Sequence, residues 1–250
     1  MSHETIDLKK YKAELLAVDA ELAKLPRGGL TRKGTRYYHF IDGKELGITN
    51  DKQLIKELCR KRCLLLLKKD LVKNISFVSR PSEKVIRQSH EERLGKLPKA
   101  YDGLPKAYFY HPSIEPWLEK SYPKMPFKAE DRKYKTKNGT LLRSKSEYII
   151  ANLLEEYGIP YRYEIPMKMG SKIIYPDFVI KHPYTGKTII WEHFGALHQP
   201  KYEASMNEKM KFYLAQGLIP FETIIYTFEF DIENTTRLES LVETILKSSY

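Results

Sequence analysis

Cysteine is scarce in this chain. Its 250 residues include only Cys59 and Cys63, which stand four residues apart in an apolar stretch of helical character, so packing explains them better than a disulfide does. No cysteine or third histidine accompanies His193 and His198 at the spacing of a zinc site. We therefore expect a reduced, intracellular protein that has no secretory segment and no zinc centre.

Long apolar runs are also missing. The longest, residues 63–67, lies among lysines and arginines and is far too short to span a bilayer. The sequence thus predicts a soluble protein with no membrane partner. Its length allows one large domain or two modest ones, each with a hydrophobic core of its own.

Acidic residues are few in the first part of the chain. Residues 1–143 hold 32 basic and 18 acidic residues, whereas residues 144–250 hold 11 basic and 14 acidic ones. A basic excess favours contact with a nucleic-acid backbone, with an affinity that falls steeply as salt rises. Lysines and arginines that merely solvate helices and linkers explain the same excess.

Residues 1–75 predict a module of two helices around a small β-hairpin. Apolar residues recur at helical spacing over about residues 5–25 and 52–73, and Asp42-Gly43 between them is a strong turn dipeptide. We expect the two helices to pair antiparallel through their leucine faces. The arrangement resembles a module of mobile-element and phage proteins. A protein partner, a homodimer and nucleic acid remain open as its binding partners.

The next segment, residues 76–127, is rich in proline, lysine and tyrosine and repeats Leu-Pro-Lys-Ala-Tyr imperfectly. We expect a linker here, whose tyrosines either pack on a neighbouring domain or stack on nucleic-acid bases. Residues 128–250 then predict a third segment with a central sheet flanked by helices. In it a helix capped by Ser144 and Glu147 and closed by Gly158 precedes three strands, a helix near residues 202–216, a strand and a last helix near 235–247.

Two strands of this segment each carry one acidic residue. Asp177 lies in the run Tyr175-Pro-Asp-Phe-Val-Ile, and Glu192 lies in Thr-Ile-Ile-Trp-Glu-His-Phe-Gly beyond a tight turn at residues 184–187. Adjacent strands would set the two carboxylates side by side, where they repel each other unless a hard cation lies between them. A solvated Asp177 and Glu192 would be the structural alternative.

This order of elements and these motifs resemble the PD-(D/E)xK nuclease superfamily, with its restriction-endonuclease-like α/β (α+β) fold, over about residues 128–230. The motifs are Arg143-Ser-Lys-Ser-Glu147, Tyr161-Arg-Tyr-Glu164, Tyr175-Pro-Asp177-Phe, and Trp191-Glu192-His-Phe-Gly195 followed by Tyr202, Lys209 and Tyr213. The family pattern asks for a lysine where this chain has Phe194. The resemblance to the sub-pattern with a migrated lysine implies that Lys209 replaces it, and a solvated Lys209 is the alternative.

The resemblance implies a Mg²⁺-dependent or Mn²⁺-dependent phosphodiesterase, an endonuclease rather than an exonuclease, of a phage, a mobile element or a defence system. Asp177, Glu192 and the backbone carbonyl of His193 would hold the metal, and Lys209 would offset charge on the phosphate. Glu147 would be a further ligand unless it only caps its helix, and Glu164 is a weaker candidate. Basic residues near the proposed site are expected to contact nucleic acid, favoured as DNA over RNA: Lys133, Lys135, Lys137 and Lys145. A nuclease fold without catalysis, acting as a binding or assembly subunit, is the alternative function.

Overall fold

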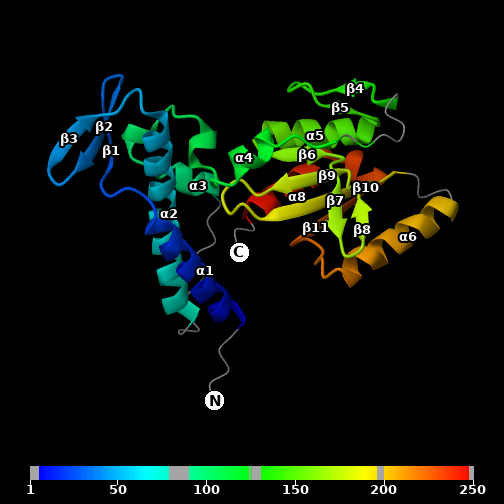
Figure 1. The fold of residues 1–250 in the computed structure, drawn as a ribbon. Helices are drawn as coiled ribbons and strands as arrows, with labels where there is room; N and C mark the ends of the chain where they lie inside the picture. Colours follow the sequence, from blue (N-terminus) through cyan, green and yellow to red (C-terminus); the bar gives the residue numbers. More distant parts are fainter. Residues whose placement is uncertain (1–5, 79–89, 124, 126–130, 196–199, 248–250) are drawn as a thin grey trace, which may run out of the picture. The chain divides into compact units, whose positions relative to one another are not determined.

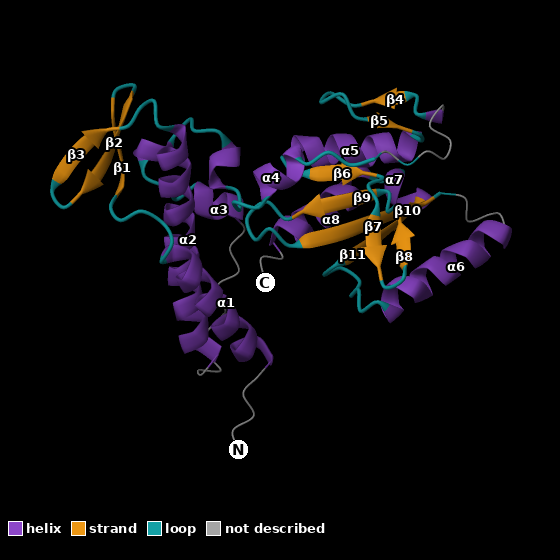
Figure 2. Cartoon of the chain, in the orientation of Figure 1, coloured by secondary structure: helices purple, strands orange, loops and turns teal. Residues whose placement is uncertain are grey.

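Helices and short strands alternate along the computed structural model, which describes residues 6–78, 90–123, 125, 131–195 and 200–247 (Figure 1). They belong to two units, the first ending at Tyr110 and the second beginning at His111. Both units combine helices with β-sheet, so the fold class is α+β, as the sequence predicts (Figure 2). None of the helices in these ranges has the length and apolarity that crossing a bilayer requires.

The first unit is built on helices α1 (Ile6–Leu22) and α2 (Lys52–Val78). Their apolar faces share a core of Tyr11, Val18, Leu64, Leu67 and Leu71. Arg60 also pairs with Glu21, at 2.6 Å from Nε to Oε1, and Lys68 pairs with Asp19. The later residue of α1, Glu21, thus pairs with the earlier residue of α2, Arg60. This order confirms that the two helices pack antiparallel.

Both cysteines lie in α2 as buried free thiols. Burial raises the pKa of each thiol to about 12, so the thiols remain protonated and unreactive at neutral pH. Packing is their role, as their spacing indicates.

Between α1 and α2 lies an antiparallel sheet of three strands, β1 (Gly29–Lys33), β2 (Arg36–Ile41) and β3 (Lys44–Gly47), rather than the expected two. The predicted turn is present, since Asp42 and Gly43 both have positive φ angles, 48° and 76°. The missed turn centres on Gly34, whose φ of 59° a side chain would disfavour.

In the segment expected to be a linker, residues 76–127, the described residues include helical elements and are divided between the two units. They form α3 (His90–Leu94), the 3₁₀ turns η1 (Lys99–Tyr101) and η2 (Lys106–Phe109), and α4 (Ile114–Glu119). Tyr101, Phe109 and Ile114 are buried, and this apolar anchoring is what turns a proline-rich stretch into structure. The expected boundary at residues 127–128 lies outside the described residues.

The second unit contains a mixed four-stranded sheet in the order β11-β10-β9-β6. Its strands are β6 (Tyr161–Tyr163), β9 (Phe178–Lys181), β10 (Thr188–Phe194) and β11 (Ile224–Phe228). The pair β10 and β11 is parallel, whereas β9 runs antiparallel to both β6 and β10. Buried β-branched and aromatic residues fill β9, β10 and β11, as expected of a sheet covered on both faces.

Helices cover the two faces of this sheet (Figure 1). On one face, Tyr163 of β6 donates a hydrogen bond to Glu147 of α5 (Lys145–Glu156), which also contacts α7 (Glu229–Ile232) and α8 (Thr235–Lys247). On the other face, Tyr213 of α6 (Pro200–Ala215) packs with Ile190 and Ile224. Glu147 and Tyr213 therefore reach the sheet from opposite sides.

The second unit also contains two small hairpins that the sequence does not predict. Strands β4 (Tyr134–Lys135) and β5 (Leu141–Leu142) form one, and β7 (Met167–Met169) and β8 (Lys172–Ile174) form the other. Met167, Met169 and Ile174 extend the apolar cluster around Tyr213. Strands of two or three residues are too short to show an alternating pattern, which is why the sequence does not reveal them.

Candidate active site

The register of β9 and β10 brings the two predicted acidic residues together. Phe178 lies opposite Trp191, so Asp177, one residue before the start of β9, comes opposite Glu192. The proline before Asp177 and the turn at residues 182–187 fix where this pairing begins and ends. The pair lies on the face that α6 covers. Glu192 and Ile190 are two residues apart on β10 and so point to the same side, where Ile190 packs with Tyr213 of α6.

Glu192 is fully buried, and both of its oxygens have donors from α6. Oε2 accepts a hydrogen bond from Lys209 Nζ at 2.6 Å, and Oε1 accepts one from the Tyr213 hydroxyl. Lys209 and Tyr213 are four residues apart and so share one face of the helix. Burial and the neighbouring charge of Glu192 raise the pKa of Tyr213, so this phenol remains a proton donor.

Lys209 completes the charge arrangement. Burial by itself would lower the pKa of its ammonium, but Glu192 and Asp177 outweigh burial and hold the pKa above its ordinary value. The side chain remains 37% exposed, while its ammonium pairs with Glu192. Lys209 is thus ion-paired with a buried carboxylate and is not a fully solvated helix lysine.

Asp177 is held differently. Its Oδ2 accepts a hydrogen bond from the backbone N–H of His193 at 2.8 Å. Burial and the negative charge of Glu192 raise the pKa of Asp177 well above its usual value, although Lys209 and the His193 N–H oppose this. The one ammonium is therefore not enough for both carboxylates, and a further positive charge would stabilise the ionised pair.

His193 directs its imidazole to the opposite face of the sheet. Nδ1 lies 3.2 Å from Thr227 Oγ1, and Nε2 lies 3.3 Å from Glu229 Oε2. Burial lowers the pKa of His193, which Glu229 partly offsets. The imidazole is thus separate from Asp177 and Glu192, and only the backbone of His193 belongs to their neighbourhood. His198, the other histidine near the motif, lies outside the described residues.

Glu147 forms the predicted capping box of α5. Ser144 Oγ accepts a hydrogen bond from the Glu147 N–H at 3.1 Å, and Glu147 Oε2 accepts one from the Ser144 N–H at 3.1 Å. The same Oε2 also accepts from the Arg143 N–H and the Tyr163 hydroxyl. Glu147 is therefore held by the cap of α5, and its charge contributes to the raised pKa of Asp177.

The metal-ligating potential of the site is limited to a pair of side chains. Among the residues that the structure describes, no three His, Cys, Asp or Glu side chains are grouped to hold a metal ion. Two carboxylates and a backbone carbonyl form a hard oxygen donor set, which suits Mg²⁺ or Mn²⁺ with water as the other ligands. Such a donor set is unsuited to zinc.

The predicted nucleic-acid contacts lie on the surface. Lys133, Lys135, Lys137 and Lys145 are exposed, and none is ion-paired with another described residue. Lys135 belongs to β4, which contacts α5, and Lys145 is the first residue of α5. They offer positive charge in the neighbourhood of the capped end of α5.

Glu164 is a buried ion-pairing residue and not a surface strand residue. Its carboxylate accepts from Arg132 Nη2 at 2.8 Å and from Arg143, and it lies just after β6 with a φ of 48°. Its backbone N–H donates to the carbonyl oxygen of Asp177 at 3.1 Å. Glu164 therefore positions the backbone of Asp177.

Comparison with known proteins adds one partial similarity. No protein-family model and no solved structure matches the chain. An 80-residue stretch is 38% identical to an uncharacterized protein of Methanocaldococcus jannaschii. The match takes in 32% of this chain and spans 7% of the archaeal protein's length.

Tyr213 and the two arginines around Glu164 were not among the predicted site residues. For Tyr213 a signal was present, since a tyrosine four residues after Lys209 must lie on the same helix face. Arg143 belongs to the Arg143-Ser-Lys-Ser-Glu147 motif, but for Arg132 the sequence holds no comparable signal, because its partner Glu164 lies on a separate element.

Proposed function

We propose that this chain is a divalent-metal-dependent nuclease that hydrolyses phosphodiester bonds, with DNA as the substrate and an internal cut as the preferred mode. The proposal depends on one observation: Lys209 Nζ lies 2.6 Å from the buried Glu192, which faces Asp177 across β9 and β10. An acidic pair at a sheet with a lysine from the following helix is the arrangement that the PD-(D/E)xK resemblance implies. The mixed sheet, flanked by α5 and α6, supports the same proposal.

Asp177, Glu192 and the His193 carbonyl would hold the cation. Bound Mg²⁺ or Mn²⁺ would supply a Lewis acid that polarises the phosphate and activates water. Tyr213 orients Glu192 through its hydrogen bond, and the His193 N–H orients Asp177. Lys209, which is partly exposed, offers its ammonium to the phosphate oxygens on which charge develops.

The buried, protonated Cys59 and Cys63 support an intracellular setting.

Cleavage assays test the proposal. Supercoiled plasmid and single-stranded DNA are incubated with the protein and Mg²⁺ or Mn²⁺, with a metal-free reaction in chelator alongside. We expect Asp177→Asn and Lys209→Met to lower the cleavage rate by about 10²–10³-fold, the usual cost of removing a group that stabilises developing charge. Lys211→Met is the matched control, because Lys211 is exposed on the same helix two residues away. Equal rates in Asp177→Asn and the wild type would refute the assignment.

The hydrogen bonds to Glu192 favour a second candidate function. Lys209 and Tyr213 occupy both of its oxygens, and Phe194 stands at the family's lysine position. A protein that keeps the nuclease fold only to bind nucleic acid or to assemble would hold Glu192 in this way without a cation. Calorimetric titration with Mn²⁺ separates the two functions, since only the enzyme requires a heat of binding that Asp177→Asn abolishes.

A further inference from the structure

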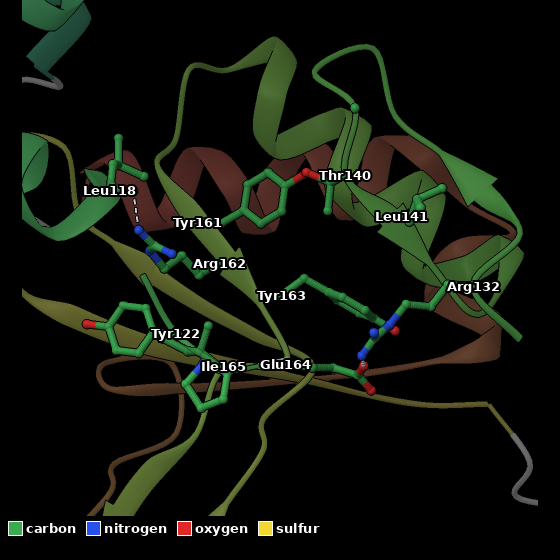
Figure 3. Close-up of a pocket in the computed structure, with 12 residues that line it drawn as sticks. Leu118, Tyr122, Arg132, Thr140, Leu141, Tyr161, Arg162, Tyr163, Glu164 and Ile165 are labelled. Atoms are coloured by element: carbon green, nitrogen blue, oxygen red, sulfur yellow. Dashed lines mark hydrogen bonds and ion pairs between the residues drawn. The ribbon is translucent and has the colours of Figure 1, made fainter. Parts of the chain in front are cut away.

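The second unit contains a cavity of about 360 Å³, lined in part by Glu164, whose N–H donates to the Asp177 carbonyl oxygen. Its walls include Tyr122, Arg132, Arg162, Tyr163 and Glu164 (Figure 3). The volume falls in the range of small-molecule sites, about 300–1,000 Å³. Its lining is aromatic and cationic, a combination that the proposed hydrolysis does not use.

Arg162 provides a cation without a carboxylate. Nε and Nη2 donate to the Trp117 carbonyl oxygen at 3.1 and 2.8 Å, and Nη2 also donates to the Leu118 carbonyl oxygen. The guanidinium carbon lies 5.4 Å from the Trp117 ring centroid and 4.8 Å from that of Tyr122. These polar partners are carbonyl oxygens and not carboxylates, so they do not neutralise the charge of Arg162.

Arg132 provides a buried donor without a partner. Its side chain is 10% exposed, with Nη2 bound to Glu164 Oε2 at 2.8 Å and to the Met125 carbonyl oxygen at 3.0 Å. Its Nε is buried and has no hydrogen-bond acceptor among the described residues. Glu164 is shared with Arg143, so one carboxylate faces two guanidinium groups. With Arg132 and Arg162 against Glu164, the lining therefore retains a positive charge, and the unsatisfied N–H of Arg132 is itself buried.

We propose that this cavity binds one nucleotide unit, with the base against the Tyr122 ring and the phosphate at Arg162 and Arg132. A nucleotide combines an aromatic face with a phosphate, and stacking on an aromatic ring next to guanidinium donors is how proteins hold single-stranded nucleic acid. The Glu164 N–H donates to the Asp177 carbonyl oxygen. A single strand of nucleic acid could therefore have one nucleotide in the cavity and a neighbouring one at the carboxylate pair. Binding itself requires neither a metal ion nor cleavage.

The test measures binding to the full-length protein in chelator. Trp117 lies against Arg162, and the quenching of tryptophan fluorescence reports occupancy. The probes are inorganic phosphate, adenosine 5′-monophosphate and a short single-stranded oligodeoxynucleotide. We expect saturable binding of the nucleotide, weaker binding of phosphate, and tighter binding of the oligonucleotide if the unit belongs to a strand. Tighter binding of the free nucleotide than of the strand would identify a small-molecule site.

Two variants locate the binding. Arg162→Gln and Tyr122→Ala should each weaken nucleotide affinity by about tenfold or more, the effect of losing a charge-assisted hydrogen bond or a stacked base. Arg237→Gln is the matched control, because that guanidinium also lies over a ring, 5.2 Å from Phe230, but belongs to α8. No saturable binding by the wild type, or equal losses in all three variants, would overturn the proposal.

Hydrogen exchange of the wild-type protein covers the case in which a variant fails to fold. Protection by the nucleotide should concentrate in residues 117–123 and 161–165, and uniform or absent protection would also overturn the proposal.

Nucleotide binding in chelator and metal-dependent cleavage are separate readouts. A protein that cleaves without nucleotide binding loses this inference alone, and one that binds without cleaving loses the proposed nuclease alone.

Discussion

Glu192 is a buried carboxylate whose stability depends on two donors from one helix. Tyr213→Phe removes the hydroxyl that donates to Oε1 and leaves that oxygen buried without a donor. We expect the free energy of unfolding to fall by about 1–3 kcal/mol, the range for a buried hydrogen bond to a charged group. Urea denaturation measures this change.

Tyr226→Phe is the control for that substitution. The Tyr226 hydroxyl is also buried near Glu192, but it has no hydrogen-bond partner in the described residues. Its removal should leave the free energy of unfolding unchanged or slightly raised, because no bond is lost. Equal destabilisation in both variants would mean that packing of the rings, and not the hydrogen bond, supports Glu192.

Asp177 makes the stability of the fold depend on pH. Because its pKa is raised in the folded protein, its contribution to stability is complete below its unfolded pKa, near 3.8, and is lost as pH rises through the folded pKa. Asp177→Asn cannot ionise, so in chelator we expect it to gain stability relative to the wild type as pH rises from about 4 to 8. Urea denaturation across this pH range checks the sign. A difference that does not vary with pH would contradict it.

At the scale of elements, the end of β6 depends on Glu164. Glu164→Gln keeps the side-chain size and removes the charge that Arg132 and Arg143 share. Breaking a buried pair in this way costs about 3–5 kcal/mol, because it leaves cations uncompensated in the interior. We expect a loss of that order in chemical denaturation.

Asp42→Asn is the matched control, since Asp42 also has a φ of 48° and also pairs with an arginine. Its pair with Arg27 is 3.5 Å long and both side chains are more than 70% exposed. Exposed pairs contribute about 0–1 kcal/mol, and asparagine tolerates the left-handed conformation, so little change is expected. A large loss here would show that backbone strain, and not burial of charge, dominates at such positions.

At the scale of the whole molecule, charge is divided unevenly between the two units. Residues 1–110 contain 24 basic and 14 acidic residues, whereas residues 111–250 contain 19 and 18. We expect the full chain to bind DNA with an affinity that falls steeply as salt rises, and residues 111–250 alone to bind more weakly with a shallower dependence. Fluorescence anisotropy at several salt concentrations measures both slopes. Identical slopes would place the electrostatic contact in the second unit.

Local chemistry in the sequence determined much of this protein. The Ser144–Glu147 capping box, the Asp42-Gly43 turn, the leucine faces of α1 and α2 and the sheet strands β9, β10 and β11 follow from residues close to one another in the chain. Helical and strand periodicities are local properties, so they remain visible without tertiary structure.

Only the tertiary structure decided which distant groups meet. Strand register placed Asp177 opposite Glu192, helix packing brought Lys209 and Tyr213 onto Glu192, and burial converted the proline-rich stretch before residue 123 into folded elements. The ion pairs of Glu164 with Arg132 and Arg143 and the cavity beside them belong to the same category. Burial, charge coupling and cavities arise between segments far apart in sequence, and packing alone sets their distances.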